Sequence, residues 1–228
     1  VIVPLWVALE LKASLLIIGI VIASRQVLPV AFSIYGGALL DRFGPRNIIL
    51  LLGTIGIVST IIFPFYPIIW VTIVLQMIIG FCETTNWIGI QSTVGTLMRS
   101  EAKYAGRLTA AARFGGFLGP VAIGIIYESF GAVGGFLAFG IWAFFGVACA
   151  AFLPPIQRNG TSGSICISAS ADIRLRVSDY RETFRLLVVP AIVLVVAATF
   201  MRQAGSGVQA SFYGIWLKEI GYTAGFIG

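Results

Sequence analysis

The chain has 228 residues, of which 58% are hydrophobic and 11% are charged, and its mean hydropathy is +0.99. A soluble domain carries about 25% charged residues, so this composition excludes a soluble globular protein, and the high hydrophobicity excludes intrinsic disorder. The absence of histidine excludes His-ligated metal sites and histidine-dependent triads, and the three widely spaced cysteines form neither a disulfide framework nor a metal clip. The net charge of +6 therefore indicates basic loops of a membrane protein and no nucleic-acid partner.

Stretches of about 20 apolar residues, long enough to cross a bilayer, recur along the whole chain. We expect six complete membrane-spanning helices at Leu15–Leu40, Ile48–Pro64, Ile68–Leu97, Leu108–Tyr127, Val133–Leu153 and Val188–Leu217. Val1–Leu9 is expected to end an earlier span and Thr223–Gly228 to begin a later one, and the chain lacks an initiator methionine. The predicted fold class is therefore all-α, a polytopic membrane protein cut within helices at both ends.

Lysine and arginine are enriched in cytoplasmic loops, so their distribution predicts the orientation of the chain. One side of the predicted membrane carries only Lys12 and Lys218. The other side carries ten basic residues, namely Arg42, Arg46, Arg99, Lys103, Arg107, Arg158, Arg174, Arg176, Arg181 and Arg185. We therefore expect loops 41–47, 98–107 and 154–187 in the cytoplasm, and the chain in the plasma or inner membrane of a cell.

The connection Pro154–Leu187 is the one extended polar stretch of the sequence. Its first part, Gln157–Ala171, is rich in serine and glycine and predicts a flexible linker. Its second part, Ile173–Leu187, mixes arginines with apolar residues, a pattern that fits both an amphipathic helix on the membrane surface and a solvated basic linker.

The sequence contains an internal repeat. The segment Trp6–Gly19 aligns with Ile215–Gly228 at a constant offset of about 209 residues, which places Glu10 on Glu219. Each copy lies at an outer loop between two spans, and six spans separate the copies. Transporters are often built from two parallel six-helix halves. We therefore expect an N-terminal helix bundle over 1–153, a cytoplasmic linker over 154–187 and the beginning of a second bundle over 188–228.

The loop between the second and third spans has the sequence GALLDRFGPR and starts at Gly37. It resembles the signature loop of the major facilitator superfamily, G-x-L-x-D-R-x-G-R-[RK], with Pro45 in place of one basic residue. The matching residues expected to act in gating are Gly37, Asp41, Arg42, Gly44 and Arg46. The resemblance implies a twelve-helix secondary transporter, of which this chain covers the end of helix 1 to the start of helix 8. An ordinary basic loop is the alternative interpretation.

A second motif opens the fifth span and resembles the antiporter motif of the same superfamily, G-x8-G-x3-G-P-x2-G-G. The matching residues are Gly106, Gly115, Gly119, Pro120 and Gly124, and Ile123 departs from the pattern. Small residues one turn apart favour close helix contact, and proline bends a helix. The resemblance implies a drug:proton antiporter, and a purely structural packing face is the alternative. In the fourth span the superfamily's arginine position is taken by Gln76, so proton coupling through that residue is not expected.

A charge inside hydrocarbon costs several kcal/mol unless it is paired or wetted, so charged residues within spans are candidate functional residues. Glu83, Arg25 and Arg202 lie near the middle of their spans. Polar residues follow the same helical periodicity around them: Gln76, Asn86 and Trp87 with Glu83, and Ser206, Gln209 and Tyr213 with Arg202. In the superfamily fold these two helices line the central cavity. Structural hydrogen bonding between helices is the alternative role.

Glu83 is the only acidic residue deep in any predicted span. Burial favours the neutral form of its carboxyl group, and a nearby arginine favours the charged form. We therefore identify Glu83 as the candidate for proton coupling, with Arg202 as its expected partner.

The leading hypothesis is a secondary transporter that exports small organic molecules in exchange for protons by alternating access. Proton-coupled uptake of sugars or organic anions is the alternative, because Arg25 and Arg202 suit an anionic solute. A non-transporting membrane receptor is a competing class, and an enzyme is not expected. The expected partners are a small-molecule substrate, protons and the lipid bilayer, without cofactor or metal, and the full-length protein is expected to be a monomer.

Overall fold

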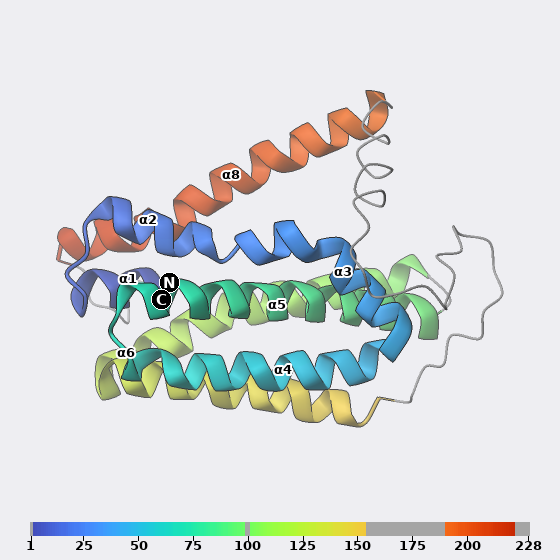
Figure 1. Ribbon diagram of the computed structural model, residues 1–228, viewed down its shortest axis with the longest axis horizontal. Helices are drawn as coiled ribbons and strands as arrows, with labels where there is room; N and C mark the ends of the chain where they lie inside the picture. The colour runs from blue at the N-terminus through green and yellow to red at the C-terminus, as the bar shows by residue number, and fades with distance from the viewer. Residues whose placement is uncertain (1, 99–100, 154–189, 222–228) are drawn as a thin grey trace. The chain divides into compact units, whose positions relative to one another are not determined.

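The computed structural model describes residues 2–98, 101–153 and 190–221. Within these three ranges the chain forms helices and their connections and no strand, which confirms the all-α class. The chain divides into two compact units, one of residues 1–157 with 211–228 and the other of residues 158–210. Figure 1 labels the helices in chain order.

The elements of the first unit up to residue 151 are α1 (Ile2–Leu9), α2 (Leu15–Ser24), α3 (Val27–Phe43), α4 (Pro45–Ile62), the 3-10 turn η1 (Phe63–Phe65), α5 (Ile69–Leu97) and α6 (Ala102–Ala151). After residues 154–189, which lie outside the described ranges, comes α8 (Pro190–Glu219), whose residues up to Ala210 belong to the second unit. Local sequence explains where helices begin. The Ser14 hydroxyl accepts a hydrogen bond from the Ile17 N–H at 3.5 Å and caps α2. Pro45 is the first residue of α4, where a missing N–H costs nothing.

Four segments within the described residues are long and apolar enough to cross a membrane: Leu15–Phe43, Pro45–Phe65, Ile69–Leu97 and Ala102–Ala151. The sequence predicted six complete spans, and α6 accounts for part of the difference. At 1.5 Å per residue the 50 residues of α6 extend for about 75 Å, whereas the hydrocarbon core is about 30 Å thick. One helix of this length is therefore enough for two crossings.

The chain reverses direction inside α6 at Gly131, and the two arms run in opposite directions (Figure 1). The φ of Gly131 is 70° and its ψ is −168°, a conformation that glycine adopts readily and other residues avoid. The connection expected between Tyr127 and Val133 is thus a reversal at a single glycine.

The last predicted span, Val188–Leu217, falls on α8 except for residues 188 and 189, which lie outside the described ranges, and among the described residues α8 has an apolar stretch at Ile192–Gly207. A full crossing needs about 20 apolar residues. Whether α8 crosses the membrane over its full length therefore stays a prediction.

The first predicted span is interrupted in its middle. Helix α2 ends at Ser24 and α3 begins at Val27, with Arg25 and Gln26 in a turn between them. The N–H of Gln26 donates to the Ala23 carbonyl at 3.0 Å, three residues back. Pro29 stands four residues after Arg25, so it has no N–H to donate to the Arg25 carbonyl, and its ring crowds that oxygen. Pro29 therefore explains the break.

Helix α5 is the centre of the first unit and packs against α2, α3 and α4. Small residues make these contacts close. A Cβ built on Gly36 of α3 would lie 3.0 Å from Thr85 Oγ1, and one on Gly56 of α4 would lie 3.6 Å from Cys82 Cβ. Because lipid chains are as apolar as the side chains, close van der Waals packing between small residues is what favours helix association in a membrane.

Three aromatic rings close one end of this helix bundle. The rings of Phe63 and Phe136 stack with centroids 4.9 Å apart, and the Trp6 ring meets them edge-on at 5.1 and 5.9 Å. All three side chains are buried. They come from η1, α6 and α1, so the cluster holds three segments that are far apart in sequence.

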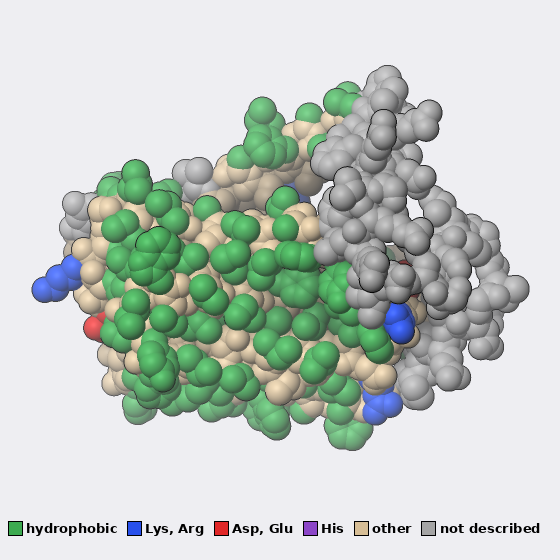
Figure 2. All heavy atoms as spheres, in the orientation of Figure 1, with side chains coloured by type: hydrophobic (Ala, Val, Ile, Leu, Met, Phe, Trp, Pro, Cys, Tyr) green, Lys and Arg blue, Asp and Glu red, His purple; other side chains and the backbone are tan. Residues whose placement is uncertain are grey.

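The surface of the helices matches an apolar solvent. Figure 2 shows hydrophobic side chains spread over the visible face, with lysine and arginine gathered toward its ends. Large apolar side chains such as Val30, Trp70 and Phe114 are exposed to 75%, 77% and 66%. A soluble protein rarely exposes apolar surface on this scale, whereas a bilayer requires it.

The internal repeat extends to backbone conformation. Lys12 has a φ of 48° and is the one non-glycine residue with positive φ in the described ranges. At the repeat offset of 209 residues, Lys12 falls on Gly221, whose φ is 103°. In both copies a residue in the left-handed region follows the end of a helix, α1 in the first and α8 in the second.

We predict that Lys12→Gly stabilises the protein. The left-handed conformation costs a residue with a Cβ roughly 1–2 kcal/mol, and glycine avoids most of this cost. The free energy of unfolding of the full-length protein in detergent should rise by about 1 kcal/mol, measured as an increase in Tm. Lys12→Ala removes the same charge but keeps the Cβ, so it serves as the control. Equal Tm values for the two variants would contradict the backbone explanation.

Candidate functional site

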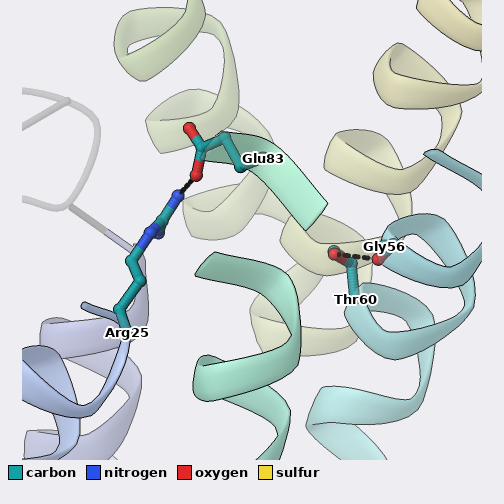
Figure 3. A network of polar contacts seen from close by, with 4 residues as sticks. All are labelled: Arg25, Gly56, Thr60 and Glu83. Atoms are coloured by element: carbon teal, nitrogen blue, oxygen red, sulfur yellow. Dashed lines mark hydrogen bonds and ion pairs between the residues drawn. The ribbon is translucent and has the colours of Figure 1, made fainter. Parts of the chain in front are cut away.

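Glu83 lies at the middle of α5, since it stands 14 positions after Ile69 and 14 positions before Leu97. Its carboxylate forms an ion pair with the guanidinium of Arg25, between Oε2 and Nη2 (Figure 3). Arg25 stands in the turn between α2 and α3, so the pair joins the broken span to the central helix. This pairing brings together two of the three deep charges that the sequence predicts.

The two partners differ in exposure. The Arg25 side chain is 34% exposed and the Glu83 side chain is 61% exposed. Glu83 therefore keeps an accessible side while it neutralises Arg25. An ion pair at this depth offsets much of the cost of placing both charges within a membrane.

The other predicted residues of α5 lie in different environments. Gln76 is 2% exposed, and its side-chain oxygen has no hydrogen-bond partner. The side-chain oxygen of Asn86 is also buried without a partner. Trp87 is 38% exposed, one turn after Glu83. Glu83 and Trp87 thus present an accessible surface, whereas Gln76 and Asn86 lie within the packed side of the helix.

The predicted residues of α8 are exposed along that helix: Arg202, Ser206, Gln209 and Tyr213. The Tyr213 ring stacks on the Trp216 ring with centroids 5.9 Å apart. Arg202, Ser206 and Gln209 belong to the second unit, whereas Glu83 belongs to the first. Within the first unit Glu83 pairs with Arg25, and the predicted partnership of Arg202 with Glu83 stays a prediction.

The signature loop is a connection of one residue. Helix α3 ends at Phe43 and α4 begins at Pro45, so Gly44 alone joins them. Gly44 has a φ of 78° and a ψ of 147°, which explains the need for glycine at this position of the motif. The guanidinium of Arg42 lies over the Phe43 ring, 5.5 Å from its centroid. Asp41 is exposed beside them at the end of α3.

Arg46 ties the signature loop to the end of α6. Its Nη2 donates a hydrogen bond to the carbonyl of Ala151 at 2.8 Å, on the last residue of α6. Free carbonyl groups at a helix C-terminus favour a cation, so this contact caps α6. Gly37 is not a close-packing position, because no described atom lies within 4 Å of a Cβ built there. The neighbouring Gly36 has that role.

Three of the four glycines of the helix-5 motif face open space. A Cβ built on Gly106, Gly115 or Gly119 would have no described atom within 4 Å. Pro120 lies inside α6 and Gly124 is buried. Close contact of this face with another helix therefore stays a prediction.

A cavity of about 250 Å³ lies between the end of α5 and the start of α6, with Gln91, Glu101 and Thr109 among its lining residues. It contains none of the predicted site residues and is open at the surface, so we do not place the site there. Within the described ranges, no group of three acidic or cysteine side chains is arranged to hold a metal ion.

Sequence reasoning missed how Arg25 reaches Glu83. A Cβ built on Gly80 would collide with the carbonyl oxygen of Arg25 and lie 2.8 Å from its carbonyl carbon and its Cγ. The backbone of Arg25 therefore rests directly on α5 at Gly80. The signal available in the sequence was Pro29, four residues after a charge at membrane depth.

Comparison with known proteins agrees with the motifs. The profile of the Major Facilitator Superfamily matches residues 1–228, the whole chain. Searches among curated proteins and among solved structures gave no match. Since the family profile covers every residue, and the apolar helices are long enough to cross a membrane, the chain belongs to the Major Facilitator Superfamily, as a multi-pass membrane protein of the secondary-transporter type.

Proposed function

We propose that the protein exports small organic molecules in exchange for protons, and that Glu83 carries the proton. The observation that supports this proposal is the ion pair between Glu83, at the middle of one candidate membrane-spanning segment, and Arg25, within another. A titratable carboxyl group at this depth, paired on one side and accessible on the other, has the properties that proton exchange requires.

The proposed coupling follows from charge balance. When a proton binds a carboxylate oxygen of Glu83, the neutral carboxyl group no longer attracts the guanidinium of Arg25. An unpaired arginine at membrane depth costs several kcal/mol, so the protein then favours an arrangement in which water or another group solvates Arg25. Loss of the proton restores the pair. Alternation between these two arrangements is how proton transfer would drive a change of access.

Proton-coupled uptake of sugars or organic anions is the second candidate. The exposed guanidinium of Arg202 on α8 favours it, because an exposed cation on a predicted cavity helix suits an anionic solute. Arg25 no longer supports this alternative, since its charge is neutralised by Glu83. The helix-5 motif, which resembles an antiporter motif, is what favours export.

We also propose the remaining assignments that follow from the sequence. Residues 1–153 form the N-terminal bundle, and residues 188–228 begin the second bundle. Loops 41–47, 98–107 and 154–187 face the cytoplasm, and the full-length protein acts as a monomer in the plasma or inner membrane. The basic residues in these three loops support the orientation.

The coupling proposal predicts a specific defect in Glu83→Gln. Glutamine keeps the shape and hydrogen bonding of the side chain but cannot bind or release a proton. In proteoliposomes with full-length protein, exchange of a transported compound across the membrane should continue, and accumulation driven by a proton gradient should be lost. Test compounds would come from a screen of small organic cations, sugars and carboxylates.

Glu10→Gln is the matched control for this experiment, because Glu10 is an exposed acid outside the helices. It should accumulate the compound as the unchanged protein does. If Glu83→Gln also drives uphill transport at the native rate, Glu83 has a structural role and the coupling proposal is wrong.

The gating role of the signature loop gives a further prediction. Asp41→Asn removes the acidic group near the end of α3, close to the connection at Gly44. It should lower turnover at least several-fold, while the amount of folded protein in the membrane stays near native. Glu101→Gln, an exposed acid at the start of α6, is the control and should transport normally. Native turnover by Asp41→Asn at matched expression would refute the role in gating.

A further inference from the structure

We infer that Gly80 and Pro29 are positioning residues that hold Arg25 within reach of Glu83. This inference deepens the proposed function, because it rests on the same ion pair and says what sets that pair. Neither residue has a group that titrates or bears charge. Their role is to place the backbone of Arg25 against α5 at one particular height.

Pro29 supplies the first part of the arrangement. It removes the N–H that would bond the carbonyl of Arg25 in a continuous helix, and the chain turns at Arg25 and Gln26 as a result. The φ and ψ of Arg25 and Gln26 stay in the right-handed helical region, so the turn changes the hydrogen bonding of the Arg25 carbonyl more than the path of its backbone. The carbonyl of Arg25 is therefore free to project toward the neighbouring helix, and it meets α5 at Gly80.

Gly80 supplies the second part. A Cβ at this position would collide with the Arg25 carbonyl oxygen and crowd its carbonyl carbon at 2.8 Å. These are backbone atoms, which cannot rotate away as the end of a side chain can. Gly89 of the same helix differs in this respect, because its Cβ would meet the tips of Leu40 and Ile49 at 3.0–3.3 Å.

The height of this contact matches the position of Glu83. Residues three apart lie on the same side of a helix, and Glu83 is three residues beyond Gly80, a rise of about 4.5 Å. An arginine whose backbone rests on Gly80 needs only its own side-chain length to reach the Glu83 carboxylate. A Cβ at Gly80 would push the Arg25 backbone away from α5 and draw the guanidinium off Glu83.

The test is a double-mutant cycle between Arg25 and Glu83, measured by Tm of purified full-length protein in detergent. Arg25→Gln, Glu83→Gln and the double variant are compared first without any other change. We expect the two single losses in Tm to sum to more than the loss in the double variant, because the second substitution finds the pair already broken.

The cycle is then repeated in a Gly80→Ala background. We expect the losses in Tm to become additive, because the pair no longer forms. The Gly89→Ala background is the matched control, since it adds the same methyl group to a tightly packed glycine of α5, and there the non-additivity should persist. A Gly80 that only packed two helices together would lower the Tm of every variant alike and leave the cycle unchanged.

A Pro29→Ala background gives a second, independent measurement if Gly80→Ala yields too little folded protein. It restores the N–H four residues after Arg25, and the losses should again become additive. The inference is overturned if the losses in Tm stay non-additive in the Gly80→Ala or the Pro29→Ala background. It is also overturned if the losses are additive in the Gly89→Ala background or in the native background. The cycle measures no transport, so a positive result stands even where Glu83→Gln still accumulates substrate and refutes proton coupling.

Discussion

A carboxylate and a guanidinium at the middle of a membrane each cost several kcal/mol unless they meet each other, other polar groups or water. Glu83 and Arg25 lie at such a depth, on α5 and in the turn between α2 and α3, and they form an ion pair. Removing one partner of a poorly solvated pair leaves the other uncompensated, which is more costly than removing both. The arrangement of α2, α3 and α5 is therefore tied to this one contact.

The helices around the pair show how such a contact is reached without a hydrophobic driving force between helices. Small residues let α5 approach its neighbours closely, at Gly36 of α3 and Gly56 of α4. At Gly80 the approach is to the backbone itself, which brings a charged residue from one span to the middle of another. A proline in one helix and a glycine in the next thus act together, although neither is polar. In a transporter this matters because the same contact that holds two spans together involves a group that a proton can neutralise.

Composition and motifs predicted the coarse features of the protein. The helical class follows from apolar stretches of membrane length, and the superfamily follows from the loop starting at Gly37, and both are confirmed. The sequence also identifies Glu83 and Arg25 separately, because any charge within an apolar stretch is conspicuous. Their pairing was not predictable in the same way. It depends on a helix break and on the height at which two helices touch, and periodicity along one helix carries no information on either.

Other differences between the sequence-based expectations and the structure have similar causes. Helical periodicity placed Gln76 and Trp87 with Glu83 on one face, but burial depends on which neighbouring helices cover that face, and Gln76 is buried whereas Trp87 is exposed. The sequence predicted two separate spans ending at Tyr127 and beginning at Val133, and both fall within one helical element in which a positive φ at Gly131 reverses the chain. The residues predicted to gate and to bind substrate stay predictions, since function at those positions depends on motions and ligands.

The most direct test of the central claim is charge exchange at the two partners. Arg25→Glu and Glu83→Arg each place like charges together at membrane depth, and the double exchange restores opposite charges in reversed positions. Measured as the Tm of full-length protein in detergent, each single exchange should destabilise the protein strongly, and the double exchange should recover most of the loss. A double exchange that is as unstable as the sum of the single exchanges would show that Arg25 and Glu83 are not partners.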